Sequence, residues 1–235
     1  MKRSKKYKSA LEKIDKQKEY SLSEAVDILP EIATSTFDAS IELHIHLNLN
    51  EKQRKRGLKG SVTLPHQVKN GTTKILVLTT PEHEQEAKDA DFVGGENYIK
   101  KIQDGWNEFD VVLATPEIMP KIAILGKVLG PKGLMPNPKS GTVTTNLSET
   151  IQQYKKGKID FKSDEQGNIH QAIGKVSMAK EELMSNTLEF IKAVNKSIKS
   201  TQTNLFKSIH ICPTMGPSVK IDPSSLEENL TTKQE

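Results

Sequence analysis

The sequence predicts an α/β protein in which one chain forms two domains with different patterns of apolar and polar residues. Strands expected near both ends alternate apolar and polar residues, which is typical of a sheet with one buried and one exposed face. Strands expected in the middle third are almost wholly apolar and alternate with helices, which is typical of a parallel sheet covered on both faces. A polar turn at residues 67–73 separates the two hydrophobicity patterns, and a domain boundary is expected there.

Composition excludes several classes of protein. The 235 residues suffice for one large or two medium domains. No uncharged apolar run approaches the ~18 residues of a membrane-spanning helix, and the lysine-rich start lacks the apolar segment of a secretory signal. We therefore expect a soluble protein with no membrane partner. The single cysteine, Cys212, excludes an internal disulfide framework, and we expect it to be a small core residue.

Positive charge is concentrated in three segments, although the net charge is only +4. Residues 1–20 carry eight Lys or Arg against three acids, and residues 51–60 carry five against one. Residues 121–140 contain four lysines and no acid. Such clusters attract phosphates and gain affinity by releasing counterions, so a polyanion is the leading partner class. Charge that only solvates the surface is the alternative.

The first domain begins with a helix whose start is marked in the sequence. Ser21 and Glu24 have capping-box spacing, and an apolar stripe follows over residues 22–29. Pro30 is expected to end or kink this helix because it lacks a backbone donor. Residues 41–50 then alternate as a half-buried strand, followed by a basic loop at 51–60 and a short strand at 61–65.

The middle third predicts a small Rossmann-like unit. Near-continuous apolar strands are expected at 74–80 and 110–116, with a charged helix near 82–90 and a second helix around Ile99 and Ile102 between them. Residues 126–141 hold four Gly and three Pro, so they predict an ordered or functional loop rather than a continuous helix.

The last third of the chain has the same kind of hydrophobicity pattern as the first third. The predicted elements are a helix at 147–156, a hairpin of 159–161 and 169–171 around the turn 164–168, a long helix at 180–199, strands at 207–211 and 219–221 around 214–217, and a loose tail over the last fourteen residues.

Enzyme signatures are weak in this chain. The Gly-rich segment fails the phosphate-cradling pattern because Pro131 stands where a second Gly is needed, so no nucleotide or other cofactor is expected. His44 and His46 are two residues apart, so both would project from the same face of the strand and could bind one metal ion. No third ligand is evident, and no metal is expected. Asp38 and the other carboxylates have no identifiable nucleophile beside them, so we expect no enzyme.

A long stretch of sequence resembles a known family. Residues 126–139, GKVLGPKGLMPNPK, with Gly141–Val143 closely resemble the signature of the large-subunit ribosomal protein "L one" family. The likeness continues in order over almost the whole chain. It includes Phe37-Asp38, Gly60–His66, Val93–Glu96, Asp164–Gly167, Ile173–Lys175 and Thr214–Gly216.

The resemblance implies a division of the chain and a set of partners. Residues 1–67 and 158–235 would form a discontinuous RNA-binding domain of α+β type with a split β-α-β sheet, and 68–157 an inserted Rossmann-like domain. Family members bind the large-subunit rRNA stalk beside the tRNA exit site and assist release of deacylated tRNA. Bacterial members also repress their own mRNA through its leader. A protein that is monomeric when free and ribosome-bound in the cytoplasm or an organelle is implied.

The resemblance also implies contact residues. It assigns rRNA contacts to Phe37, Glu42, Asp164, Ser208, Thr214, Met215 and Gly216. Gly216 would let the backbone approach RNA, Phe37 and Met215 would touch an exposed sugar or base, and the carboxylates would accept from 2′-hydroxyls. A second set in the Gly-rich segment would meet RNA phosphates or the facing first domain. It comprises Lys127, Gly130, Lys132, Gly133, Asn137 and Lys139.

The chain departs from the family pattern in two places, and two alternative functions are considered beside the resemblance. Pro30 stands where the family helix continues, and 51–58 is more basic than the usual family loop, so its contacts are not transferred. One alternative function is a small α/β enzyme with a nucleotide in the Gly-rich segment. The other is a translational repressor that works off the ribosome.

Overall fold

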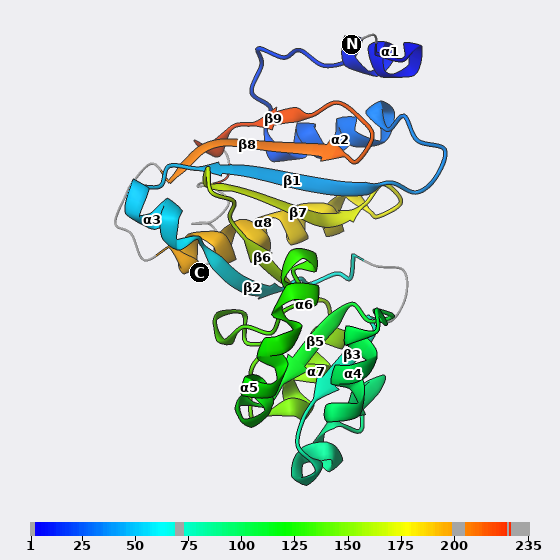
Figure 1. Ribbon diagram of the computed structural model, residues 1–235. Helices are drawn as coiled ribbons and strands as arrows, with labels where there is room; N and C mark the ends of the chain where they lie inside the picture. The colour runs from blue at the N-terminus through cyan, green and yellow to red at the C-terminus, as the bar shows by residue number, and fades with distance from the viewer. Residues whose placement is uncertain (1–2, 69–72, 199–204, 225, 227–235) are drawn as a thin grey trace, which may run out of the picture. The chain divides into compact units, whose positions relative to one another are not determined.

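The computed structural model describes residues 3–68, 73–198, 205–224 and 226 (Figure 1). Its contacts divide the chain into two compact units. The first unit is Met1–Val68 with Asp160–Glu235, and the inserted unit is Lys69–Ile159. Of the last fourteen residues, which are predicted to form a loose tail, only 222–224 and 226 lie within the described part of the chain.

An antiparallel sheet is the centre of the first unit. Its strand order is β7-β1-β8-β9, and β2 pairs with β6 in a separate small sheet. Helix α8 packs on β7, and α2 packs on β8, β9 and α8 (Figure 1). The elements concerned are α1 Lys5–Glu12, α2 Leu22–Ile32, β1 Ser40–Leu47, α3 Glu51–Arg56, β2 Lys59–Thr63, β6 Lys158–Lys162, β7 Asn168–Lys175, α8 Lys180–Ser197, β8 Phe206–Pro213 and β9 Val219–Ile221.

Strand β1 has the predicted alternation. Ile41, Leu43, Ile45 and Leu47 are buried, and the residues between them are partly exposed. The strand ends at Leu47, and Asn50 begins a helix that was not predicted. The Asn50 N–H donates to Gln53 Oε1 at 3.0 Å. The predicted loop at 51–60 is therefore wrong, because it contains α3 and the start of β2.

Helix α2 begins with the predicted capping box. The Glu24 N–H donates to Ser21 Oγ at 3.3 Å, and the Ser21 N–H donates to Glu24 Oε2 at 3.2 Å. Pro30 is expected to end or kink the helix, and of these two outcomes an end at Pro30 does not occur, because α2 continues to Ile32. Pro30 lies in the last turn, where a missing donor interrupts little of the helix. The following Ala33 N–H still donates to the Leu29 carbonyl at 3.1 Å.

The inserted unit has the predicted parallel sheet, of order β4-β3-β5. Leu76 and Leu78 of β3 enter one core, whereas Ile75 and Val77 enter the core on the opposite face. Burial on both faces explains why the strand is apolar without a break. The elements are β3 Ile75–Leu78, η1 Pro81–Ala87, β4 Phe92–Gly94, α4 Glu96–Gln103, β5 Val111–Ala114, η2 Pro116–Ile118, α5 Met119–Ile122, η3 Ala123–Leu125, α6 Gly126–Lys132, η4 Pro138–Ser140 and α7 Leu147–Lys155.

Three local predictions need correction. The charged helix near 82–90 is the 3-10 helix η1, and the short strand β4 was not foreseen. The first half of the Gly-rich segment is the helix α6, which ends where Gly133 takes φ +72°. β6 and β7 do not form the predicted hairpin, because they belong to different sheets and share only the bridge Ser163–Ile169.

Gly174 of β7 is expected to be intolerant of a side chain. A Cβ there would lie 2.2 Å from Leu183 Cδ2 and 3.1 Å from Met178 Sδ, and Leu183 is itself buried. We expect Gly174→Ala to lower the free energy of unfolding of the first unit by about 1 to 2 kcal/mol through overpacking. Urea unfolding followed by far-ultraviolet circular dichroism measures this. Gly126→Ala, where a Cβ meets nothing within 4 Å, is the control, and equal losses would contradict the prediction.

Candidate nucleic-acid interface

Five of the predicted RNA contacts gather where β1 and β8 meet. We call Phe37, Glu42, Thr214, Met215 and Gly216 the strand-end cluster. Thr214 directly follows β8, and its N–H donates to the Ser40 carbonyl at 2.9 Å. Its hydroxyl lies 3.0 Å from the same carbonyl and 2.8 Å from Glu42 Oε1. The hydroxyl proton therefore points into the protein, and the oxygen keeps lone pairs for a ligand.

The cluster exposes two large apolar side chains. Phe37 is 63% exposed and Met215 is 61% exposed. The Thr34 hydroxyl donates to the Met215 carbonyl at 2.9 Å, and the Ser35 hydroxyl donates to the Phe37 carbonyl at 3.0 Å. The segment before β1 is thus bonded to the turn after β8. Among the described residues, the only other exposed large hydrophobic side chain is Ile124 of the inserted unit.

Gly216 has a role inside the protein. A Cβ at this position would lie 2.5 Å from Pro213 Cγ and 2.9 Å from the Ile32 carbonyl oxygen. The Gly216 N–H donates to the Pro213 carbonyl at 2.8 Å. The glycine therefore lets the turn close against the end of α2, which fixes the position of Met215. This contact is additional to the predicted approach to RNA.

The remaining two predicted contacts, Asp164 and Ser208, lie toward the opposite end of β1. There His46 pairs with Ser208 on one side and with Asn168 on the other. Asp164 Oδ1 accepts from the Gln166 N–H at 2.9 Å and from the Asn168 N–H at 2.6 Å, and Oδ2 accepts from Asn168 Nδ2 at 2.9 Å. Burial would raise the pKa of Asp164, but the hydrogen bonds from Asn168 and Gln166 outweigh it and lower this pKa.

The Asp164 carboxylate should stabilise the turn between β6 and β7. We expect Asp164→Ala to lower the free energy of unfolding by about 1 kcal/mol at neutral pH, a small value because the group is exposed. A lowered pKa means that this stability is present above the unfolded pKa of about 3.9 and is lost as pH falls through the folded pKa. Urea unfolding from pH 7 downward should show the difference from wild type shrinking. Exposed Glu165→Ala is the control, and a difference that persisted in acid would contradict the assignment.

Histidines occupy the exposed face of the sheet between the two ends. His44 pairs with His170 on β7 and with His210 on β8, so the other two histidines lie on either side of His44. Burial, with a smaller effect of His170, lowers the pKa of His44. Burial, with a smaller effect of Lys220, lowers the pKa of His210. Both rings are therefore mostly neutral at neutral pH, and they add little positive charge to this face.

Cys212 is buried, as predicted. Burial, together with the neighbouring Glu42 carboxylate, raises the pKa of its thiol to about 11. The thiol is therefore protonated at neutral pH in the free protein.

The second predicted set lies on or after α6. Lys127, Gly130 and Lys132 are exposed. Asn137 turns the chain, because its N–H donates to Thr142 Oγ1 at 2.7 Å and its carbonyl accepts from the Ser140 N–H at 3.2 Å. Leu134 and Met135 pack on the core of the inserted unit, and the side chain of Lys139 lies outside the described part. The segment thus combines anchoring apolar residues with solvent-facing lysines.

The structure does not favour a nucleotide in this segment. A phosphate-cradling loop needs to run directly from a strand into a helix. The preceding strand β5 ends at Ala114, short helices intervene, and Gly126 to Lys132 are themselves helical.

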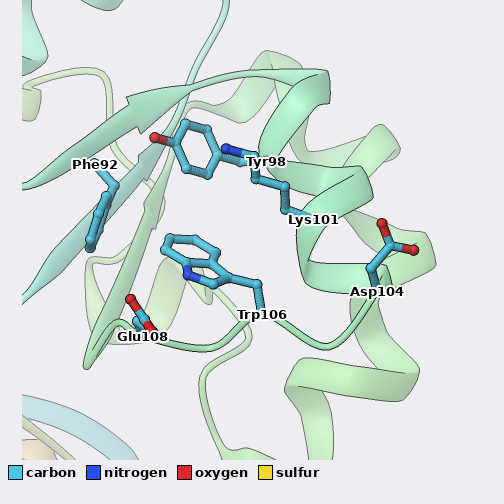
Figure 2. A pocket seen from close by; sticks show the side chains of 6 residues that line it. All are labelled: Phe92, Tyr98, Lys101, Asp104, Trp106 and Glu108. Atoms are coloured by element: carbon cyan, nitrogen blue, oxygen red, sulfur yellow. The ribbon is translucent and has the colours of Figure 1, made fainter.

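The inserted unit has a pocket that the sequence did not single out. Its volume is about 420 Å³, and its lining residues are Phe92, Tyr98, Lys101, Asp104, Trp106 and Glu108 (Figure 2). The ring centroids of Trp106 and Phe92 lie 5.0 Å apart in an edge-to-face arrangement. Lys101 Nζ lies 4.9 Å from the centroid of Tyr98. The aromatic side chains come from β4, α4 and the loop after α4, and their spacing gives no warning that they meet.

The fold is that of an α/β protein, and its first unit exposes the strand-end cluster. The chain belongs to the Ribosomal protein L1p/L10e family, which it matches over residues 29–217. It is 45% identical to the large ribosomal subunit protein uL1 of Bacteroides thetaiotaomicron and 44% identical to that of Phocaeicola vulgatus. It is also 44% identical to that of Macrococcus caseolyticus. Each comparison covers 96% of this chain and 98% of the relative.

The family confirms several predictions. The resemblance to ribosomal protein "L one" is confirmed, and so is the α/β fold class. The expectation that the chain is not an enzyme is confirmed, because the family consists of structural ribosomal proteins. Within the described helices, none is both long and apolar enough to cross a bilayer.

Proposed function

We propose that this protein is a structural component of the large ribosomal subunit and that its first unit binds the rRNA stalk beside the tRNA exit site. The names of its relatives support the ribosomal role. The observation that carries the RNA-binding role is the strand-end cluster. It places two exposed apolar side chains beside a hydroxyl and a carboxylate that hydrogen-bond each other. Exposed apolar surface alone would attract many partners, whereas this combination suits the ribose hydroxyls and exposed bases of RNA.

The chemistry of the cluster favours RNA over DNA. Phe37 and Met215 offer apolar contact to an unstacked base or a ribose face. Glu42 and Asp164 are acceptors, so they repel phosphates but accept hydrogen bonds from 2′-hydroxyls and base amino groups. The lysines of α6 and the basic residues of α1 and α3 supply the long-range attraction that the carboxylates lack.

Binding to RNA fragments tests the proposal. Equilibrium binding of the protein to a large-subunit stalk fragment and to an unrelated hairpin is measured across a salt series. Tight stalk binding that survives about 0.2 M salt, with much weaker hairpin binding, supports shape and 2′-hydroxyl recognition. Equal binding of both RNAs, lost alike as salt rises, would leave only an electrostatic patch and would overturn the proposal.

Two finer parts of the proposal have their own tests. Assistance with release of deacylated tRNA requires a ribosome-bound protein, so co-sedimentation with large subunits separates it from a repressor that works off the ribosome. Repression of the protein's own mRNA requires a leader that binds the same surface. A reporter under that leader should fall in output when the protein is in excess, and a constant output would rule out this role.

A further inference from the structure

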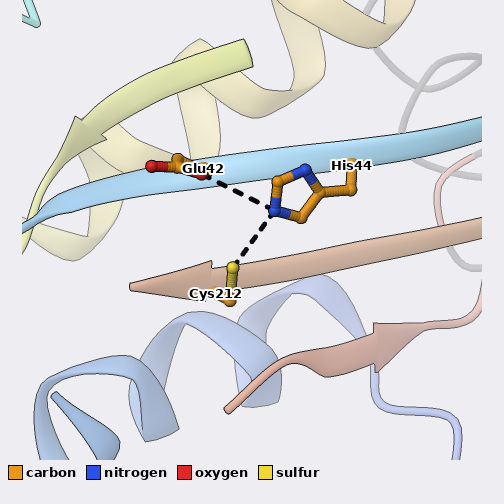
Figure 3. Close-up of side chains that lie close together, drawn as sticks. All are labelled: Glu42, His44 and Cys212. Carbon is orange, nitrogen blue, oxygen red and sulfur yellow. Dashed lines mark hydrogen bonds and ion pairs between the residues drawn. The ribbon is translucent and has the colours of Figure 1, made fainter. Parts of the chain in front are cut away.

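Three side chains with metal-binding atoms converge on the face of the four-stranded sheet that carries the histidines, where Glu42 and His44 are partly exposed and Cys212 is buried. His44 Nε2 lies 3.2 Å from Cys212 Sγ and 3.7 Å from Glu42 Oε2 (Figure 3). The three donor atoms all lie within 4.8 Å of one another. The set combines a thiol, an imidazole and a carboxylate, which differ in softness and together suit zinc better than calcium or magnesium.

The strand register holds these donors in place. Glu42 and His44 are alternate residues of β1, so both project from the same face. Cys212 of β8 pairs directly with Glu42, which puts its sulfur diagonally across from His44. Glu42 is further restrained by the hydrogen bond between its other oxygen and the Thr214 hydroxyl. A site on two paired strands loses little conformational freedom when an ion binds.

His170 completes the arrangement from the far side of His44. The two Nδ1 atoms lie 2.8 Å apart, which requires one of them to carry the proton between them. When His44 Nδ1–H donates to His170 Nδ1, His44 Nε2 has a free lone pair and accepts from the Cys212 thiol. Metal-binding histidines use the same arrangement, in which the second nitrogen donates to a neighbouring acceptor and fixes the tautomer.

We propose that Glu42, His44 and Cys212 form a binding site for one divalent transition-metal ion, with Zn²⁺ as the preferred ion. Tetrahedral zinc with ordinary bond lengths places its nitrogen about 3.6 Å from its sulfur ligand and about 3.4 Å from its oxygen ligand. The observed separations differ from these by about 0.4 Å or less. The ion takes the position of the thiol proton, which is released to solvent. Thiolate and carboxylate then balance its two charges, and water occupies the fourth position.

Cobalt provides a direct probe, because it reports thiolate ligation optically. The free full-length protein is titrated with Co²⁺ at mildly alkaline pH without RNA. We expect a thiolate-to-cobalt charge-transfer band and strong visible bands of tetrahedral cobalt, and added Zn²⁺ should remove both. Cys212→Ser and His44→Gln should weaken Co²⁺ binding at least about tenfold, and Cys212→Ser should abolish the charge-transfer band. His46→Gln, on the same strand face but outside the site, should bind like wild type.

A second measurement does not depend on whether the variants fold. Cys212 is the only cysteine, so alkylation of the wild-type protein reports this site alone. Stoichiometric Zn²⁺ should slow alkylation at least about tenfold. Absence of both the charge-transfer band and this protection would overturn the proposal, as would equal weakening by His46→Gln, which indicates adventitious binding to surface histidines. Because the free protein is used, failure here is independent of the proposed RNA binding.

Discussion

Replacing Thr214 and Met215 together by alanine is expected to weaken binding to the stalk RNA fragment by about 2 to 3 kcal/mol, a loss of roughly 30- to 160-fold. Met215 is 61% exposed in the free protein, so its truncation removes contact area for RNA with little effect on the core. The Thr214 hydroxyl bridges Ser40 and Glu42 and presents its lone pairs outward, so its loss removes an acceptor and releases the Glu42 carboxylate.

The salt dependence separates this effect from a loss of charge. Neither substituted residue is charged, so the number of counterions released on binding should not change. A plot of the logarithm of the association constant against the logarithm of the salt concentration should therefore shift downward with almost the same slope. A variant of the exposed lysines, Lys127→Ala with Lys132→Ala, should instead reduce the slope if α6 meets RNA phosphates.

Ile124→Ala is the matched control for the apolar part. Ile124 is 66% exposed, comparable with Met215, but belongs to the inserted unit. The Ile124→Ala variant should bind stalk RNA with an affinity within about twofold of that of the wild-type protein. Thermal melting of each variant checks that the first unit remains folded. If the double variant folds and binds like wild type, the strand-end cluster is not the RNA contact.

Secondary structure is predicted best from the sequence where the burial of a single strand or helix sets the pattern of apolar residues in it. The alternation in β1 and the unbroken apolar run of β3 follow from burial on one face or on two, and both are visible without tertiary information. Helix α3 shows how a local signal can be overlooked. Asn50 and Gln53 have the spacing of a capping pair, but the five basic residues around them suggest a loop.

The candidate site could be predicted only in pieces. The residues of the strand-end cluster were assigned through the resemblance, whereas their proximity depends on the pairing of Glu42 with Cys212 across 170 positions. No periodicity encodes that register. The same limit applies to the proposed metal site. The sequence points to His44 as a candidate ligand and to Cys212 as a core residue, and it does not show that the sulfur of Cys212 faces His44.

Asn186 is a buried polar residue that links three segments of the first unit. Its side chain is fully buried on α8. Asn186 Oδ1 accepts from the His66 N–H at 3.0 Å, and Nδ2 donates to the carbonyls of His66 at 3.0 Å and Ile173 at 2.9 Å. These bonds join the segment after β2 to α8 and β7, and therefore hold together the two stretches of chain that form this unit.

Asn186→Ala should lower the free energy of unfolding of the first unit by about 2 to 4 kcal/mol, because it leaves three backbone groups without partners. Asn186→Asp keeps the volume and one acceptor but directs an oxygen at two carbonyls, so it should be at least as damaging. A mild effect of Asn186→Asp would show instead that the lost volume dominates. Exposed Asn195→Ala on the same helix is the control. Far-ultraviolet circular dichroism follows both units together, while the fluorescence of Trp106, the only tryptophan, reports the inserted unit and should change as in wild type. Loss of the first unit should therefore appear as a circular-dichroism change at lower urea that the fluorescence does not share. That contrast locates the damage, since a general loss of stability would move both signals together.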